Sequence, residues 1–177
     1  MPTFVREFDR LVSDLRRPTA PGKFFIVVYP PPAERRVERE LPQLRERLHE
    51  HGVSSAVVNV NDVVNDVIRA RLDDLQAAWV DNREAAFEDV RDRSIEALQL
   101  ATREADSNVG VIWWTRVGGA YPFFRIASVT ERLIARLSAS LVVLYPGAHE
   151  AKTHFALLGK RDGYQYRFEY VYEIDES

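Results

Sequence analysis

Apolar residues follow two alternating patterns along the chain: short unbroken runs, and longer stretches in which they recur every three to four positions. The unbroken runs at residues 24–29, 109–114 and 141–145 are rich in β-branched and aromatic side chains, as expected for strands covered on both faces. A further run at residues 53–60 predicts a second strand along the chain. Because strands that alternate with helices pair in parallel through right-handed crossovers, we expect an α/β fold with a mostly parallel sheet of about four strands flanked by helices.

The stretches with helical spacing predict the flanking helices. One covers residues 4–15, and another covers residues 37–48, where Pro42 should kink the helix or restart it. Residues 61–105 are too long for one helix of an ordinary domain. We therefore expect two helices with a break near residues 81–82, an arrangement that allows a projecting arm to meet a partner.

The segment at residues 117–125 reads Val-Gly-Gly-Ala-Tyr-Pro-Phe-Phe-Arg and joins a buried strand to a helix predicted over residues 123–137. Gly118 and Gly119 permit a tight turn, and Pro122 suits the first turn of the helix. Ligands in α/β proteins bind beyond the carboxyl ends of parallel strands. A tight turn that needs small residues is the alternative explanation for both glycines. The predicted ligand edge consists of Tyr29, Arg116, Gly118, Gly119, Arg125, Tyr145 and Gly147.

The last part of the chain has a different pattern. Asp162 and Gly163 are typical of a hairpin turn between residues 154–158 and a run in which aromatic and other residues alternate. We expect a C-terminal antiparallel β-hairpin that completes the sheet. Its aromatic face either packs under a helix or binds a partner protein. The candidate interface residues are Tyr164, Tyr166, Arg167, Phe168, Tyr170 and Tyr172 from this run, with Trp79 and Phe87 from the middle helices.

Composition places the chain among ordinary soluble globular proteins. Its 177 residues, 46% of them hydrophobic, fit a single domain over residues 1–177 with its own core. The chain has no cysteine, which excludes thiol nucleophiles and thiolate metal sites. We expect a cytoplasmic protein without membrane contact, because no signal-like start or membrane-length apolar run is present. The net charge of −3 argues against direct binding of nucleic acid through bulk charge, while leaving room for a local basic patch.

Motifs for metal or cofactor binding are weak. Gly22 and Lys23 precede a strand, whereas a phosphate-binding loop follows one. His149 and His154 are five residues apart, whereas two zinc ligands on one face of a helix are four residues apart. We therefore expect no metal, no cofactor and no catalytic residues, and hence no enzyme.

Three groups of residues, read together, carry a resemblance to a known family: the segment at residues 118–125, the triplet Tyr145-Pro146-Gly147, and Phe155 with Tyr164, Tyr166, Arg167 and Phe168. They resemble the BrxB family of BREX phage-defence systems. The similarity begins near the strand that ends at Tyr29 and covers nearly the whole chain. It implies a small non-enzymatic component that works beside a PglZ-type protein of the alkaline-phosphatase superfamily, a DNA methyltransferase and a large ATPase.

Three hypotheses about function follow. The first is an adaptor or assembly subunit that binds a PglZ-type partner, and in some assemblies other BREX components, through aromatic and helical-arm surfaces. The second is a degenerate nucleotide- or phosphate-binding regulatory domain that uses Gly118, Gly119 and Arg125. The third is an accessory protein that binds nucleic acid on the tyrosine-rich strand.

Overall fold

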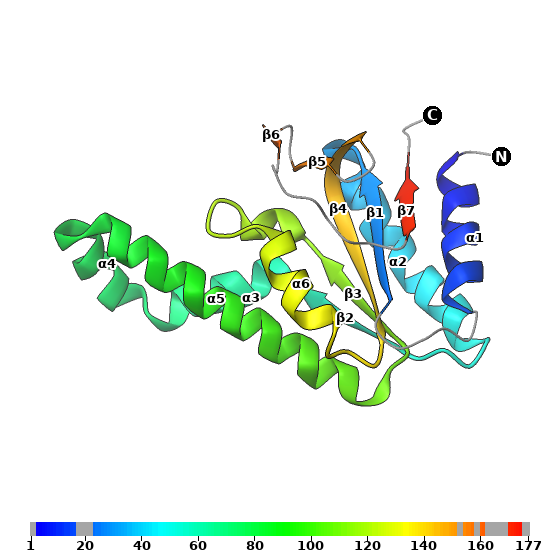
Figure 1. Cartoon of the computed structure of the whole chain (residues 1–177), viewed down its shortest axis with the longest axis horizontal. Helices are drawn as coiled ribbons and strands as arrows, with labels where there is room; N and C mark the ends of the chain where they lie inside the picture. The colour runs from blue at the N-terminus through cyan, green and yellow to red at the C-terminus, as the bar shows by residue number, and fades with distance from the viewer. Residues whose placement is uncertain (1–2, 17–22, 152–153, 158–159, 162–169, 175–177) are drawn as a thin grey trace.

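A parallel sheet forms the centre of the protein in a computed structural model that describes residues 3–16, 23–151, 154–157, 160–161 and 170–174 (Figure 1). The strands run in the order β2 (Ser55–Asn59), β3 (Val111–Thr115), β4 (Ser140–Ala151), β1 (Phe24–Tyr29) and β7 (Tyr170–Glu173). Each neighbouring pair in this order is parallel. The predicted α/β fold with a mostly parallel sheet is confirmed, with β7 as a parallel strand beyond the four expected.

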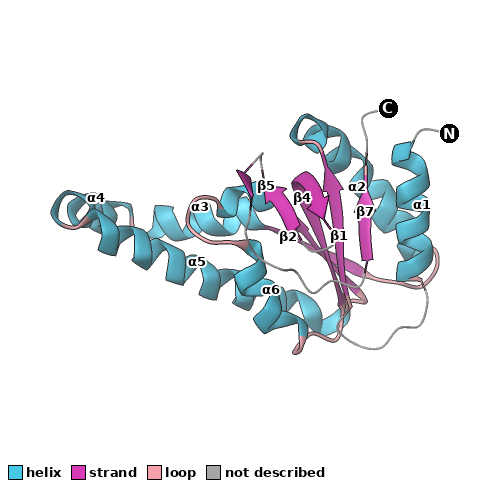
Figure 2. Cartoon of the chain, turned by 45° about the horizontal axis from the view of Figure 1, so that its top comes forward, coloured by secondary structure: helices cyan, strands magenta, loops and turns pink. Residues whose placement is uncertain are grey.

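Helices cover both faces of this sheet (Figure 2). One face carries α1 (Thr3–Leu15) and α2 (Glu34–His49). The other face carries α3 (Val60–Ala70), α5 (Arg83–Ala105) and α6 (Ile126–Ile134). Three short 3-10 helices, η1 (Pro31–Ala33), η2 (Asp106–Asn108) and η3 (Val117–Ala120), lie at the ends of longer elements.

Two apolar layers explain why the central strands are apolar without interruption. Successive side chains of a strand point to opposite faces, so a strand covered on both sides needs apolar residues at every position. On β3, Trp114 packs with α3, α5 and α6, whereas the adjacent Trp113 packs with α1 and α2. Ile26 and Val27 of β1 divide in the same way. All four side chains are fully buried.

A helical arm projects from the sheet (Figure 1). It consists of α3, α4 (Leu72–Asp81) and the N-terminal half of α5, and α4 lies at its far end. The predicted break near residues 81–82 is confirmed at Asn82, which takes an extended conformation and accepts the Ala85 N–H at 3.1 Å as the N-cap of α5. A second break at Arg71 separates α3 from α4 and was not predicted. The middle segment therefore holds three helices, not two.

Both prolines expected to mark helix boundaries behave differently in the structure. α2 is one helix that continues through Pro42, whose side chain is exposed, so water can bond the backbone carbonyl that lacks a helical donor. Pro122 does not start a helix, because the chain stays non-helical through Arg125. α6 therefore begins at Ile126, the first residue of its buried face.

The C-terminal region contains antiparallel pairing, at a different place from the one expected. β4 extends beyond the sheet, and its last residues pair antiparallel with β5 (His154–Leu157), which in turn pairs with β6 (Lys160–Arg161). The predicted turn at Asp162 and Gly163 lies outside the described residues. β7 pairs in parallel with β1 and is no arm of that hairpin. The unpaired edge of β1 offers backbone groups to β7, and this pairing allows Tyr172 to be buried beside α1.

A buried hydrogen-bond chain joins α5 to the sheet. The indole N–H of Trp114 donates to the hydroxyl of Thr102 at 3.1 Å, and that hydroxyl donates to the Leu98 carbonyl at 2.7 Å. All three residues are completely buried. A buried N–H without an acceptor is costly, so this chain holds α5 at one position on the sheet.

We predict that Thr102→Val lowers the free energy of unfolding by about 1–3 kcal/mol, because the indole N–H of Trp114 loses its acceptor while the side-chain shape is kept. Urea unfolding measures the loss. Thr130→Val is the matched control, since Thr130 is also buried but its hydroxyl donates to the carbonyl of Ala127, which the helix itself also bonds. Equal losses in the two variants would contradict the role given to the Trp114 bond.

Candidate functional site

The carboxyl edge of the sheet holds fewer accessible side chains than the sequence predicted. Tyr29 and Tyr145, both predicted at the ligand edge, are buried in the two apolar layers. Gly147 lies in the part of β4 that pairs with β5. Arg125 is the N-cap residue of α6, and its carbonyl accepts the Ser128 hydroxyl at 2.7 Å. These residues follow the strands as expected, but they do not form one open surface.

Arg116 directly follows β3, and its side chain binds α2, which covers one face of the sheet. Its backbone is left-handed, with φ of 51°. The guanidinium donates to Glu38 of α2 through two nitrogens, Nε to Oε1 and Nη2 to Oε2, the second at 2.7 Å. Such a bidentate pair fixes the orientation of the guanidinium. The arginine predicted to meet a ligand is therefore engaged by a carboxylate of this chain.

Tyr29 and Glu34 form the inner part of this charged cluster. Burial is the main reason that the pKa of the Tyr29 hydroxyl is raised, and the nearby Glu34 carboxylate raises it further. The hydroxyl donates to the carbonyl of Leu144 at 3.5 Å. Burial is likewise the main reason that the pKa of Glu34 is raised, and the nearby Glu38 carboxylate raises it further. Contacts with Tyr29 and Arg116 act in the opposite direction on Glu34. The cluster ties η1 and the start of α2 to the ends of β1 and β3.

Gly119 is required by close packing. A Cβ atom added to Gly119 would lie 2.7 Å from Cα and 2.6 Å from Cβ of Asn61, at the start of α3. Real Cβ atoms essentially never approach backbone so closely, so only glycine allows η3 to lie against α3. The tight-packing explanation thus accounts for Gly119 without a ligand, and Gly118 precedes it in the same 3-10 helix.

The arm carries a different kind of site. An apolar hollow of about 530 Å³ lies where α4 meets α5 and the segment that follows η3. We call it the arm groove. It is lined by Ile68, Leu72, Leu75, Gln76, Trp79, Val80, Phe87, Val90, Pro122 and Phe123. Both arm residues predicted as interface candidates, Trp79 and Phe87, belong to it.

The apolar side chains of the arm groove are unusually accessible. Trp79 is 46% exposed and Leu72 is 49% exposed, while Val80 is 85% exposed. No residue of α4 is buried. A ten-residue helix is too short to be stable by itself, so α4 depends on its contact with α5 and offers the rest of its apolar surface to solvent.

Aromatic contacts shape the floor and the rim of the arm groove. The Phe87 ring packs against the Phe123 ring with centroids 5.2 Å apart, which joins α5 to the segment before α6. The guanidinium of Arg83 lies 5.3 Å from the centre of the Trp79 ring, on the rim. The floor is therefore held between two parts of the chain, while Trp79 remains accessible.

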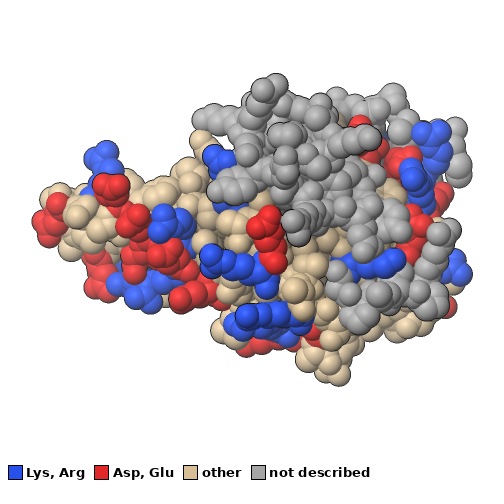
Figure 3. All heavy atoms as spheres, viewed as in Figure 1, with Lys and Arg blue, Asp and Glu red and all other residues tan. Residues whose placement is uncertain are grey.

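The surface around the arm groove is acidic. Residues 72–92 contain seven carboxylates and two arginines. Figure 3 shows acidic side chains gathered on the projecting arm. A binding partner that covers the groove would accordingly match it with an apolar anchor flanked by basic residues.

The tyrosine-rich run lies partly within the core. Its residues Tyr164, Tyr166, Arg167 and Phe168 are outside the described residues. Tyr170 is the first residue of β7. Tyr172 is buried, and its hydroxyl donates to Asp14 of α1 at 2.5 Å. Its ring stacks near Phe25 with centroids 6.5 Å apart, so Tyr172 belongs to the core and not to an exposed interface.

Sequence reasoning found part of the arm groove and missed the rest. The helical spacing of Leu72, Leu75 and Trp79 was visible, and it indicated one apolar face. Pro122 and Phe123 were assigned to a helix start, although they close one side of the groove. Their apolar character is plain in the sequence, but nothing local connects residue 123 to residue 87.

Metal ligands and membrane-spanning helices are both missing from the described part of the chain. There, no group of three or more His, Asp or Glu side chains is arranged to hold a metal ion. None of the helices in these segments combines the length and the apolar character needed to cross a membrane.

Comparison with known proteins adds one result. A family model described as BREX protein BrxB matches residues 46–170, well over half of the chain. The matched segment includes the whole arm, the arm groove and the glycine segment. Comparisons with curated proteins and with solved structures gave no match.

We predict that Gly119→Ala destabilises the protein by roughly 1–3 kcal/mol or more, because the new Cβ meets the backbone of Asn61. Chemical denaturation measures the change. Gly110→Ala is the matched control: its Cβ would approach only the Val53 side chain, at 3.1 Å, which can move. If Gly119→Ala were tolerated as well as Gly110→Ala, η3 would not be held against α3 in this way.

We predict that Glu34→Gln stabilises the protein near pH 7.5, and stabilises it less near pH 4.5. The raised pKa of Glu34 means that the folded state binds its proton more tightly than the unfolded state. The tighter binding of this proton stabilises the folded state fully at pH values below the pKa of Glu34 in the unfolded chain. The stabilisation is lost as the pH rises through the pKa of Glu34 in the folded protein. Glutamine has no charge to bury, so it removes the penalty that applies at higher pH.

Thermal melting of wild type and Glu34→Gln at both pH values tests this. Glu46→Gln is the control, because Glu46 is an exposed glutamate of the same helix. A stabilisation by Glu34→Gln that is equal at the two pH values, or larger at pH 4.5, would contradict the prediction.

Proposed function

The chain belongs to the BrxB family of BREX proteins, and we propose that it acts as a non-enzymatic adaptor that binds a PglZ-type partner through the arm groove. Family membership makes it a component of a BREX phage-defence system. The finer role proposed here is assembly in the cytoplasm: one surface of this protein holds an alkaline-phosphatase-superfamily protein near other BREX components.

The arm groove is the observation that carries this proposal. Exposed tryptophan and leucine side chains in one hollow are uncommon on a protein that acts alone, and such patches mark binding surfaces. The groove also lies within the segment that matches the family. Trp79, on its rim, has the residue type that most often dominates a protein interface.

The chemistry of the groove limits what the partner surface can be. An apolar floor accepts an aromatic or aliphatic anchor, for example from an amphipathic helix that lies between α4 and the segment at Pro122. The carboxylates of residues 72–92 favour lysine or arginine beside that anchor. We therefore expect the PglZ-type partner to present an apolar segment with a basic border.

The arm also suits a docking role mechanically. α4 has no buried residue, so its position can adjust to a partner without disturbing the sheet. The N-cap at Asn82 and the Arg71 break mark its two ends. Binding would bury the exposed faces of Leu72, Trp79 and Val80 and remove them from water.

We predict that Trp79→Ala weakens binding of the PglZ-type partner by about 2 kcal/mol or more, roughly thirtyfold in Kd, because it removes the exposed tryptophan of the groove. Co-expression pull-down with the BREX neighbours, followed by calorimetry on the purified pair, measures the change. The melting temperature should stay within about 2 °C of wild type, since Trp79 is half exposed and lies on a helix without buried residues.

Leu100→Ala is the matched control for this experiment. Leu100 is 51% exposed, similar to Trp79, but it lies on α5 outside the arm groove. Loss of binding in Trp79→Ala with retention in Leu100→Ala supports the docking site. Binding that survives Trp79→Ala unchanged would rule out the groove, and failure of wild type to capture any PglZ-type neighbour would rule out the adaptor role.

A further inference from the structure

A second hollow lies at the opposite end of α5 from the arm groove. It has a volume of about 340 Å³ and is formed where the last turns of α5 meet α6. Arg103, Arg132 and Arg136 line it, together with Gln99 and the buried Leu133. Basic side chains are visible over α6 and the adjoining turns of α5 in Figure 3. Three guanidinium groups, from α5, from α6 and from the turn after α6, thus line one concave surface.

These arginines differ from most arginines of the arm, which have carboxylate partners. On the arm, Arg93 pairs with Asp89 at 2.8 Å, Arg69 pairs with Asp66 at 3.4 Å, and Arg71 also pairs with Asp89. Within the residues that the structure describes, none of Arg103, Arg132 and Arg136 makes an ion pair. The lining of the hollow therefore keeps its positive charge uncompensated.

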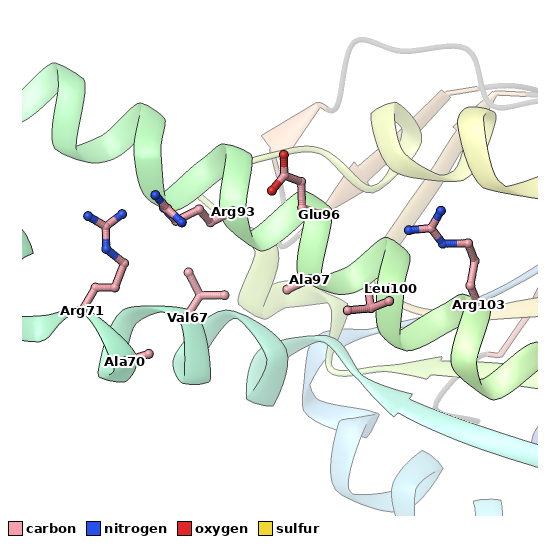
Figure 4. Close-up of a pocket in the computed structure, with 8 residues that line it drawn as sticks. All are labelled: Val67, Ala70, Arg71, Arg93, Glu96, Ala97, Leu100 and Arg103. Carbon is pink, nitrogen blue, oxygen red and sulfur yellow. The ribbon is translucent and has the colours of Figure 1, made fainter.

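An adjoining hollow of about 520 Å³ shows the contrast directly (Figure 4). Arg71 and Arg93 lie toward one end of this hollow, and both bind the same aspartate. Val67 and Ala97 lie between α3 and α5 in its middle. Arg103 lies toward the other end and also lines the hollow at α6. Glu96 also lines this hollow, between Arg93 and Leu100, so the arginine without an ion pair lies at the far end, at Arg103.

The fold holds the two arginine-bearing elements in a fixed relation. Asp106, just after α5, accepts the backbone N–H of Ser138 at 3.0 Å and of Ala139 at 2.7 Å, just after α6. Both oxygens of this nearby carboxylate are occupied by backbone donors. Arg132 lies in the last turn of α6, and Arg136 lies in the turn that follows this helix.

Helix dipoles explain only part of this arrangement. Arg103 and Arg132 occupy the last turns of α5 and α6, where a positive charge interacts favourably with the carbonyl end of a helix. That interaction favours one basic residue at each end. It does not explain why Arg136, in the turn after α6, lines the same hollow as Arg103 and Arg132 in a chain whose net charge is −3. Glu104 and Glu131 are next in sequence to Arg103 and Arg132, but neither glutamate lines the hollow.

We propose that Arg103, Arg132 and Arg136 form a binding site for a phosphate group, carried either by the backbone of a nucleic acid or by a free nucleotide. The planar fork of each guanidinium matches phosphate oxygens in bidentate fashion. Three cations suit a ligand with several negative charges, such as a polyphosphate or a run of phosphodiesters, better than a ligand with a single carboxylate. This site is separate from the arm groove and does not depend on the function proposed for that groove.

The test uses the full chain and two classes of probe. Fluorescence anisotropy with labelled 20-nucleotide single-stranded and duplex DNA at 50 mM NaCl measures binding to a phosphodiester backbone. Calorimetry with ATP and with pyrophosphate measures binding of free phosphate groups. We expect binding to at least one class, reduced roughly tenfold or more in the triple variant Arg103→Gln, Arg132→Gln, Arg136→Gln. With duplex DNA, the logarithm of the binding constant falls linearly with the logarithm of the salt concentration. In the triple variant this slope should become less steep by about 0.9 for each phosphate that is no longer neutralised.

The control variant is Arg35→Gln, Arg39→Gln, Arg69→Gln, which removes the same charge from exposed positions on α2 and the arm. Circular dichroism verifies that both variants fold. Retained binding in the control with loss in the site variant supports the proposal, and the class of probe that binds identifies the source of the phosphate. Equal weakening in both variants would mean general electrostatic attraction and would overturn the site, as would absence of binding to every probe at 50 mM NaCl.

Discussion

The need to cover both faces of the parallel sheet is the constraint on which the other features of this protein depend. β1, β3 and β4 carry apolar side chains along their central runs, with Trp113 and Trp114 on opposite faces of the same strand. Neither face can be left in water, so the chain places α1 and α2 on one side and α3, α5 and α6 on the other. The edge strand β7 then completes the face under α1 by bringing Tyr172 into contact with Asp14. Each helix other than α4 has a position determined by the sheet it covers.

α5 connects this core to the two candidate binding surfaces. Its C-terminal half is anchored on the sheet through Thr102 and Leu98, and its N-terminal half extends beyond the sheet to support α4. The arm groove includes Phe87, near the start of α5, and the arginine hollow includes Arg103, in its last turn. At the rise of an α-helix these two positions are about 24 Å apart. A rigid helix thus separates an apolar surface with an acidic border from a basic hollow, which would allow two different ligands to be held at the same time.

At the carboxyl edge of the sheet, residues in a position typical of ligand sites are explained by packing and by contacts within the chain. A glycine pair after a buried strand occupies the position where many α/β proteins bind ligands. Here Gly119 allows η3 to approach Asn61, and Arg116 is held by Glu38. Tyr29 and Glu34 lie close to each other at the same edge, where burial raises the pKa of both groups. The resulting network joins helices on opposite faces of the sheet, and so it stabilises the region in which a ligand was expected.

The sequence by itself determined the fold class, the central strands, most helices and the family, because these depend on patterns local to each segment. Residues 24–29 are unbroken in apolar character whatever lies beside them, and the break between two helices near residues 81–82 was also visible in the local pattern. Trp79 and Phe87 were also recognisable as interface candidates from their spacing. Only the tertiary structure decided that Phe123 packs on Phe87, that β7 pairs in parallel with β1, and that Arg103 joins Arg132 and Arg136. Each of these contacts joins residues far apart in the chain, and their position depends on how whole helices and strands pack against the sheet, which no local pattern records.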